Sequence, residues 1–442
     1  MSATYIRSWQ TRYEAEPRNP MTEHQKPRII VPPAVIKAVL NDDRVDEPPH
    51  SFYKYPARFS PSFAREAIKA FTQPGDTVVD PFCGGGTSLV EAISLGRKAA
   101  GFDISSLAVF LSRAKTSPLS VHDKREILAW ADFMASAKLE KVASSFASIE
   151  EEAHYLRNLP GNTRSYFETI IYWAEALPKE RQRRFVRLIL LAVGQWALDC
   201  KTEVPSWSQL RAEFCQRVKL VAGQHFDFLS QVAAKNKMPR CRVTQMRRII
   251  NRSSESSHDD GRIPDDWLPA KLILTSPPYP GVHVVYHRWQ INGRKETPAP
   301  FWLANSRDGA GEAHYCLGRR SEPELKTYFA RLEKAFSSVR GLVNKNSLVV
   351  QLVAFSEPDW QLPTYLSAME ASGFREVLPV CASEYLFEER IWRQVPGRKW
   401  YAHQKGKTAG SKEVLLLHKP AHVSPVRGIF VAPSERGCWT AV

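Results

Sequence analysis

A glycine-rich turn with an acid in front of it fills residues 80–87, with the sequence DPFCGGGT. Glycines let the backbone approach a bound molecule closely, and a helix is expected to begin at Thr87. Asp80 would repel an anionic group such as a pyrophosphate, whereas it would attract a positively charged group. The turn taken alone would also fit other doubly wound enzymes, so its ligand has to be assigned together with a second residue.

That second residue is Asp103, which ends the next predicted strand. A carboxylate at this place can accept hydrogen bonds from both hydroxyls of a ribose. The sulfonium and ammonium groups of S-adenosylmethionine suit Asp80, and its ribose suits Asp103. The two acids therefore predict S-adenosylmethionine as the cofactor.

Residues 275–279, with the sequence TSPPY, follow the predicted strand KLIL and form the most specific chemical pattern in the chain. Pro277 and Pro278 have no N–H group, so this stretch presents carbonyl acceptors without competing donors. The hydroxyl of Ser276 stands beside them, and the ring of Tyr279 offers a flat face for stacking. Acceptors on the hydrogens of an exocyclic base amine would favour a tetrahedral nitrogen with its lone pair aimed at a methyl donor. These four residues are the predicted catalytic group.

A parallel sheet must position these motifs. A strand, a turn, a helix and a second strand are expected over residues 77–80, 81–86, 87–95 and 98–103, which is a βαβ unit with its ligand at the carboxyl ends of the strands. Further strands are expected at 247–251, 271–274, 347–355 and 413–420, and further helices at 34–40, 61–71, 322–339 and 363–372. The predicted class is α/β, with a doubly wound, mostly parallel, Rossmann-like sheet and a helical insertion.

Composition shifts along the chain predict four segments. A Pro-rich N-terminal arm is followed by a first part of the catalytic domain, a helical insertion, and a second part that carries TSPPY and a basic C-terminal stretch. Within the insertion, Ser206 followed by Gln209 predicts a helix that begins with a capping box. The predicted bounds of the segments are 1–49, 50–106, 107–240 and 241–442.

Together, DPFCGGGT, the acid in GFDIS and TSPPY resemble the motifs of the S-adenosylmethionine-dependent DNA amino-methyltransferases. Residues 50–61 (HSFYKYPARFSP) are similar to the stretch that this family places before the glycine turn, around the methionine end of the cofactor. The resemblance covers about residues 50–105 and 265–290. It implies a methyltransferase fold with cofactor contacts from Tyr55, Pro56, Phe59, Asp80, Pro81, Phe82, Cys83, Gly84, Gly86, Thr87 and Asp103.

The resemblance also implies the substrate. Family members with Ser at the position of Ser276 mostly methylate cytosine at N4, whereas Asp or Asn there usually accompanies methylation of adenine at N6. We therefore expect a methyltransferase that acts on a flipped-out cytosine of double-stranded DNA. Restriction-modification or self-marking is the expected role, with a cognate restriction endonuclease as a partner. Adenine N6 methylation, methylation of an RNA amine and a non-catalytic DNA-binding protein with this fold are the alternatives.

The charge of the chain favours a nucleic acid as its partner. Lysine and arginine number 61 against 46 aspartates and glutamates, a net charge of +15. Residues 390–412 hold seven basic residues and no acid, which predicts a hairpin that faces DNA, and residues 280–290 follow TSPPY closely enough to clamp the base. The arginines at 181, 183, 184 and 187 are instead expected to form a solvated helix face. The expected DNA contacts are His283, Arg288, Arg390, Arg393, Arg398, Lys399, Trp400 and Lys405.

Other classes of protein are disfavoured by the sequence. Seven cysteines without a C-x-x-C pair argue against a disulfide framework and a structural zinc site, and no ligand spacing predicts a metal. A 5-methylcytosine mechanism would use a Cys after a Pro, which the chain lacks. The N-terminus has no apolar signal-peptide core, and the apolar stretch at 188–198 is too short to cross a bilayer. A cytoplasmic protein without a membrane partner is expected.

Overall fold

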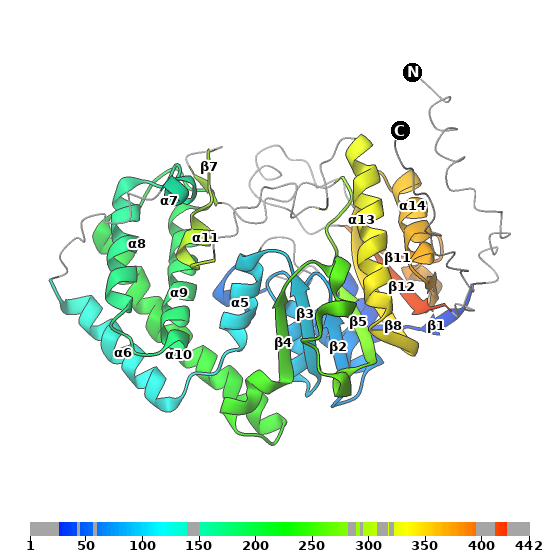
Figure 1. Cartoon of the computed structure of the whole chain (residues 1–442), viewed down its shortest axis with the longest axis horizontal. Coiled ribbons are helices and arrows are strands. Elements are labelled where there is room, and N and C mark those ends of the chain that lie inside the picture. Colours follow the sequence, from blue (N-terminus) through cyan, green and yellow to red (C-terminus); the bar gives the residue numbers. More distant parts are fainter. Residues whose placement is uncertain are drawn as a thin grey trace, which may run out of the picture.

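The computed structural model describes residues 26–41, 45–55, 60–138, 150–281, 289–291, 295–306, 317, 322–394 and 412–421. A central sheet lies beside a group of helices, drawn in cyan to green in Figure 1. Within the described residues, no helix combines the length and the apolar character that crossing a membrane requires.

Five neighbouring parallel strands form one side of the eight-stranded sheet of the described residues and include one of its edges. Counted by their position across the sheet, the chain forms the third of these strands first, then the second and the first. It then returns to form the fourth and the fifth. The strand order therefore reverses between the third strand, β2, and the fourth strand, β5. Strands β12 (Lys412–Pro420), β11 (Ile391–Gln394) and β9 (Phe374–Glu376) extend the sheet in antiparallel pairs beyond β8. The predicted class is confirmed. The parallel strands are, in spatial order, β4 (Arg247–Asn251), β3 (Lys98–Asp103), β2 (Thr77–Asp80), β5 (Ala270–Thr275) and β8 (Val343–Phe355).

Helices cover both faces of the sheet. Successive residues of a strand point to opposite faces, so Val78 and Val79 enter two different cores. The core around Val78 includes residues of α3 (Pro61–Phe71) and α4 (Thr87–Ser94), and the core around Val79 includes α13 (Glu322–Arg340) and α14 (Pro358–Ala371). Because both faces are buried, the central strands are continuous apolar runs without alternation.

The helices between β3 and β4 build a third core. Helix α6 begins with a capping box at Ser120. Helix α10 begins with the predicted capping box at Ser206. Near the end of α10, Leu229 and Val232 leave this core and join that of the sheet. The bounds predicted for the four segments stay a prediction. The helices are α5 (Ser106–Thr116), α6 (Val121–Ser136), α7 (Glu150–Tyr155), α8 (Gly161–Ala174), α9 (Glu180–Leu198) and α10 (Trp207–Lys235).

Several short elements complete the described fold. Helix α2 begins at Pro33, close to the predicted start, and packs into the core around Val78. The remaining short elements were not predicted. They are β1 (Arg28–Ile30), parallel to β10 (Leu378–Val380), the antiparallel pair β6 (Trp289–Ile291) and β7 (Lys295–Thr297), and helix α11 (Ala299–Leu303).

The carboxylate of Asp80, at the end of β2, ties three parts of the fold together. One of its oxygens accepts hydrogen bonds from the backbone N–H of Phe82 at 3.0 Å and from the hydroxyl of Thr275 at 2.7 Å. Its other oxygen accepts from the hydroxyl of Ser88 on α4. The glycine turn, the first helix after it and the end of β5 are thereby held at one buried group.

Burial raises the pKa of Asp80 to about 6, although the hydrogen bonds from Ser88, Thr275 and Phe82 oppose this rise. The folded chain therefore binds a proton here more tightly than the unfolded chain does. The stability that this proton contributes is present below about pH 4 and is lost as the pH rises through about 6. We expect Asp80→Asn to remove this pH-dependent decrease in the free energy of unfolding, which amounts to about 3 kcal/mol at most. Urea unfolding of the wild type and of Asp80→Asn between pH 4 and 7.5 measures the decrease.

The second variant for this test is Ser88→Ala, which removes one donor to the carboxylate. The pKa of Asp80 should then rise further, so the loss of stability should extend to higher pH. Parallel stability curves for the wild type and Asp80→Asn would contradict the prediction.

Candidate active site

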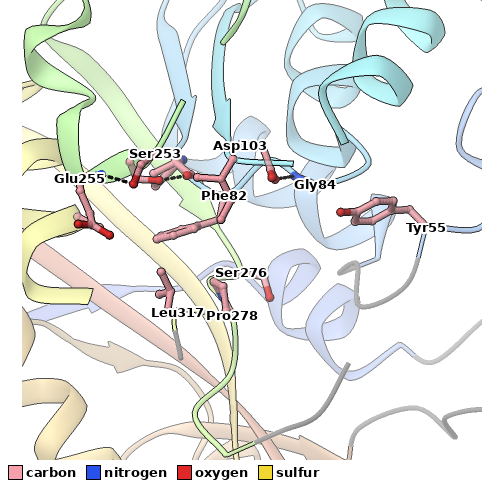
Figure 2. A pocket seen from close by; sticks show the side chains of 13 residues that line it. Tyr55, Phe82, Gly84, Asp103, Ser253, Glu255, Ser276, Pro278 and Leu317 are labelled. Atoms are coloured by element: carbon pink, nitrogen blue, oxygen red, sulfur yellow. Dashed lines mark hydrogen bonds between the residues drawn. The ribbon is translucent and has the colours of Figure 1, made fainter. Parts of the chain in front are cut away.

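A cavity opens where the carboxyl ends of β2, β3, β4 and β5 meet, beside the point where the strand order reverses. Ligands of doubly wound sheets bind at this position. Figure 2 shows Phe82 and Asp103 from the first half of the chain across from Ser276 and Pro278. The two motifs therefore wall one space. The lining residues are Tyr55, Pro81, Phe82, Gly84, Asp103, Ile104, Ser253, Ser254, Glu255, Ser276, Pro278, Leu317 and Ala335.

Asp103 is held in place by the backbone around it. Its carboxylate accepts hydrogen bonds from the N–H of Gly84 and the N–H of Ser105, both at 2.8 Å. Asp103 lies in the cavity wall, so its place suits the predicted contact with a ribose.

Tyr55 covers the glycine turn. A Cβ atom on Gly84 would come within 3.0 Å of the Tyr55 ring, and one on Gly85 would lie 2.8 Å from the Tyr55 Cβ. Any side chain at these two positions would displace the tyrosine from the cavity wall. Pro56 and Phe59, the other residues predicted from this stretch, lie outside the described residues.

Four predicted cofactor residues, Asp80, Cys83, Gly86 and Thr87, lie behind the cavity wall and do not line it. Asp80 is 1% exposed and uses both oxygens inside the fold, so its predicted attraction for a sulfonium is replaced by a structural role. Burial, and then Asp103 and Asp80 nearby, raise the pKa of the Cys83 thiol, which packs in the core. Pro81, Phe82 and Gly84 line the cavity, and their contacts with a cofactor stay a prediction.

Residues 253–255 form a part of the wall that the sequence did not assign. They follow β4, the neighbour of β3, so the sheet order brings them to Asp103. The Ser254 hydroxyl donates to the Pro81 carbonyl, and Glu255 pairs with Arg331 of α13 at 2.8 Å. An acid soon after a predicted strand was the available signal for Glu255. No sequence signal marked the apolar residues Ile104, Leu317 and Ala335.

The TSPPY stretch holds a chain of hydrogen bonds. The Ser276 hydroxyl donates to the Tyr279 hydroxyl at 2.9 Å, and Tyr279 donates to the carboxylate of Glu413 on β12 at 2.8 Å. Tyr279 is 6% exposed and does not line the cavity. The structure therefore shows it positioning Ser276, and its predicted stacking on a base stays a prediction. Pro277 is buried behind Ser276 and Pro278.

Two arginines predicted to contact DNA are engaged inside the fold. Arg390 is 5% exposed and forms two hydrogen bonds with Glu376, at 2.7 and 2.9 Å. Arg393 pairs with Glu413 at 2.6 Å and donates to the carbonyl of Val39 at 2.8 Å. Both guanidinium groups hold the edge of the sheet, and we withdraw them from the DNA-facing set. The other predicted contacts, His283, Arg288, Arg398, Lys399, Trp400 and Lys405, lie outside the described residues.

Among the described residues, Glu47, His50 and Glu91 bring their ligand atoms close enough for a metal ion. Arg65 already donates to both carboxylates, at 2.8 Å to Glu47 and at 2.8 and 2.9 Å to Glu91. A guanidinium group supplies the positive charge that a metal would supply, so we assign an ion-pair network here.

The cavity has the chemistry of a site for a cationic nucleoside. Asp103 contributes negative charge, and Tyr55 and Phe82 contribute aromatic rings, which suit a base or a cation. Its volume of about 60 Å³ is smaller than that of ordinary small-molecule sites, at about 300 Å³ or more. A nucleoside would therefore have to widen the cavity on binding.

Known proteins match parts of this chain. A family model described as DNA methylase, of the N6/N4 methyltransferases, matches residues 8–112. The type II methyltransferase M.MvaI of Kocuria varians is 31% identical over 128 residues, which are 28% of this chain and 25% of that protein. The type II methyltransferase M.MjaII of Methanocaldococcus jannaschii is 29% identical over 79 residues, 18% of this chain and 15% of that protein. The matches thus span a quarter or less of these relatives.

A solved structure of the rRNA methyltransferase aviRa from Streptomyces viridochromogenes aligns with 86% of this chain and 96% of its own. The identity is 13% and the TM-score is 0.27, a score that carries no argument about substrate. The residues that the family model matches include the glycine turn and Asp103 of the cavity wall. On the matched segments, the chain is similar to the DNA amino-methyltransferases.

Proposed function

We propose that this chain transfers a methyl group from S-adenosylmethionine to the exocyclic amine of a base in double-stranded DNA, and that the base is cytosine, methylated at N4. The observation that carries the proposal is the presence of Ser276 and Pro278 in the same cavity as Gly84 and Asp103. An acceptor for an amine and an acceptor for a ribose in one cavity suit a reaction between a base and a nucleoside cofactor. The base must leave the helical stack to reach this cavity.

The direction of the hydrogen bonds supports Ser276 as an acceptor for the amine. A carboxylate only accepts, so the hydrogen of Tyr279 points to Glu413 and the hydrogen of Ser276 points to Tyr279. This arrangement leaves the lone pairs of the Ser276 oxygen for an N–H donor. We propose the carbonyl of Pro277, the next residue in the chain, as the second acceptor.

These acceptors define what the chain contributes to the reaction. S-adenosylmethionine, when bound, supplies an electrophilic methyl group on a sulfonium. Its sulfur would keep the electron pair of the broken S–CH3 bond as a thioether, and the amine nitrogen would lose one proton to water. Ser276 and the Pro277 carbonyl would each hold one hydrogen of the amine, which draws the nitrogen lone pair away from conjugation with the ring. Asp103 would hold the ribose, and Tyr279 and Glu413 would fix Ser276. Self-marking of DNA in a restriction-modification system, with a cognate endonuclease, is the proposed role.

The first test identifies the product. The purified chain is incubated with isotopically labelled S-adenosylmethionine and unmethylated duplex DNA, and the DNA is digested to nucleosides for mass spectrometry. We expect labelled N4-methylcytosine. Labelled N6-methyladenine would keep the reaction type and overturn the choice of base, and label in RNA alone would overturn DNA as the substrate.

The second test addresses the orientation of Ser276. Ser276→Ala should lower kcat on DNA by about a hundredfold, because one acceptor for the amine is lost. Tyr279→Phe should also lower kcat, because Ser276 loses its acceptor while the ring is kept. Cofactor affinity, measured by calorimetry, should be retained in both variants. Ser367→Ala, the same change on the exposed side of α14, is the control. Wild-type turnover by Tyr279→Phe would contradict the orienting chain.

The third test addresses the cofactor. Asp103→Asn should weaken binding of S-adenosylmethionine by about tenfold or more, because hydrogen bonds to a charged acceptor are lost. Calorimetric titration measures the dissociation constant, and Asp259→Asn, which changes an exposed acid in the segment after β4, is the control. An unchanged dissociation constant would remove Asp103 from the cofactor site.

A further inference from the structure

A second cavity lies between helices α5 and α9, outside the candidate active site. Its volume is about 350 Å³, within the range of ordinary small-molecule sites. Helix α5 contributes residues at positions 106, 109, 110 and 113, and α9 contributes residues at positions 180, 184 and 187, each set on one helix face. The cavity is thus built by two facing helices. Its lining residues are Ser106, Val109, Phe110, Arg113, Glu180, Arg184, Arg187, Asn251, Ala304, Asn305 and Ser306.

Three arginines converge on this cavity. Arg113 donates one hydrogen bond to the carbonyl of Ile249 at 2.8 Å, and none of the described carboxylates forms an ion pair with it. Burial, and then Arg184 and Arg262 nearby, lower the pKa of Arg113, so positive charges are crowded here. Arg187, with 16% of its side chain exposed, donates to the carbonyl of Leu303 at 3.0 Å.

The acids facing these arginines neutralise them only in part. Glu180 pairs with Arg184 at 2.8 Å, and Glu175 lies 4.0 Å from Arg187. The side chains of Glu180 and Glu175 are 65% and 61% exposed, so water screens both pairs. Among the described lining residues, Arg113 and Arg184 face the single carboxylate of Glu180, which leaves an excess of positive charge that an anion would complete.

The two cavities are lined by neighbouring residues of the same segments of the chain. Asp103, the last residue of β3, lines the first cavity, and Ser106, the first residue of α5, lines the second. The segment after β4 contributes Ser253 to the first cavity, and the last residue of that strand, Asn251, lines the second. The Asn251 amide also donates to the backbone carbonyl of Asp103 at 2.9 Å. A DNA strand that delivers a base to the first cavity would therefore carry its backbone phosphates past the second cavity.

We propose that the arginine cavity between α5 and α9 binds a backbone phosphate of the DNA strand whose base enters the candidate active site. This inference rests on the proposed function. It replaces the expectation that Arg184 and Arg187 belong to a solvated helix face, because their guanidinium groups border a cavity together with an arginine from another helix. Planar guanidinium forks match phosphate oxygens, and phosphate contacts position a duplex without reading its sequence.

The test measures DNA binding separately from methyl transfer. Fluorescence anisotropy with a labelled 20-base-pair duplex, without cofactor, gives the association constant over a range of salt concentrations. Arg184→Gln should weaken binding by about tenfold at low salt, equally for duplexes of different sequence. The slope of the logarithm of the association constant against the logarithm of salt concentration should shrink by about 1. Calorimetric binding of S-adenosylmethionine should be unchanged.

Two further variants keep the test decisive. Arg125→Gln removes an equivalent charge from the exposed side of α6 and should leave the slope of the wild type unchanged. Arg113→Gln removes the arginine of the facing helix and should reproduce the loss seen with Arg184→Gln, with thermal unfolding as the check on its fold. A slope unchanged in both Arg184→Gln and Arg113→Gln would overturn the phosphate site.

The outcomes separate this inference from the proposed function. A wild-type chain that methylates DNA while both variants bind as tightly as it does overturns the phosphate site alone. A wild-type chain that binds the duplex through these arginines but transfers no methyl group overturns the proposed function alone. A wild-type chain that binds no duplex overturns the phosphate site, whatever its activity.

Discussion

The buried carboxylate of Asp80 is the interaction on which the candidate site depends. It accepts hydrogen bonds from the glycine turn, from α4 and from the end of β5, so one group fixes the relative positions of two motifs that the sequence separates widely. Burial of a carboxylate is unfavourable unless donors surround it, and here three donors do. Its raised pKa reflects that balance between burial and hydrogen bonding. The cavity exists because β2 and β5 are neighbours whose ends are joined at this point.

Hydrogen bonds between buried side chains also orient other residues near the candidate site. Glu413 shows this most clearly, because it accepts from Tyr279 and pairs with Arg393 at the same time. One buried acid on β12 thereby orients the residue that orients Ser276, and it also neutralises an arginine. A charged group with two partners inside a fold is costly to remove, since each partner would be left buried and unpaired. The hydroxyl of Ser276 is thus directed by strand β12, far from it in the sequence.

The helices between β3 and β4 border the arginine cavity. Their first member, α5, follows directly from the strand that carries Asp103, and α9 faces it across the arginine cavity. Both cavities are bordered by the ends of β3 and β4 and the residues that follow them, so a shift of either wall would affect both. The helical group and the sheet therefore meet along the edge where the candidate active site opens. In the proposed function, DNA bound along this edge would meet the arginines of the helices while its base lies at the sheet.

The sequence by itself determined the central strands, the glycine turn, the placement of Asp103 and Ser276, and the α/β class, because these depend on local patterns: apolar runs, glycine spacing and proline pairs. Strands as short as β1, β6 and β10 could not be predicted, since three residues carry too little periodicity and only their partners define them. Tertiary structure alone decided the uses of Asp80, Tyr279, Arg390 and Arg393, which looked available for a ligand or DNA but are buried against distant partners. It also decided that Ser254 and Glu255 reach the cavity and that Arg184 meets Arg113. Whether a polar group faces solvent, a ligand or another side chain depends on which distant segments fold against it, and a linear sequence does not specify those neighbours.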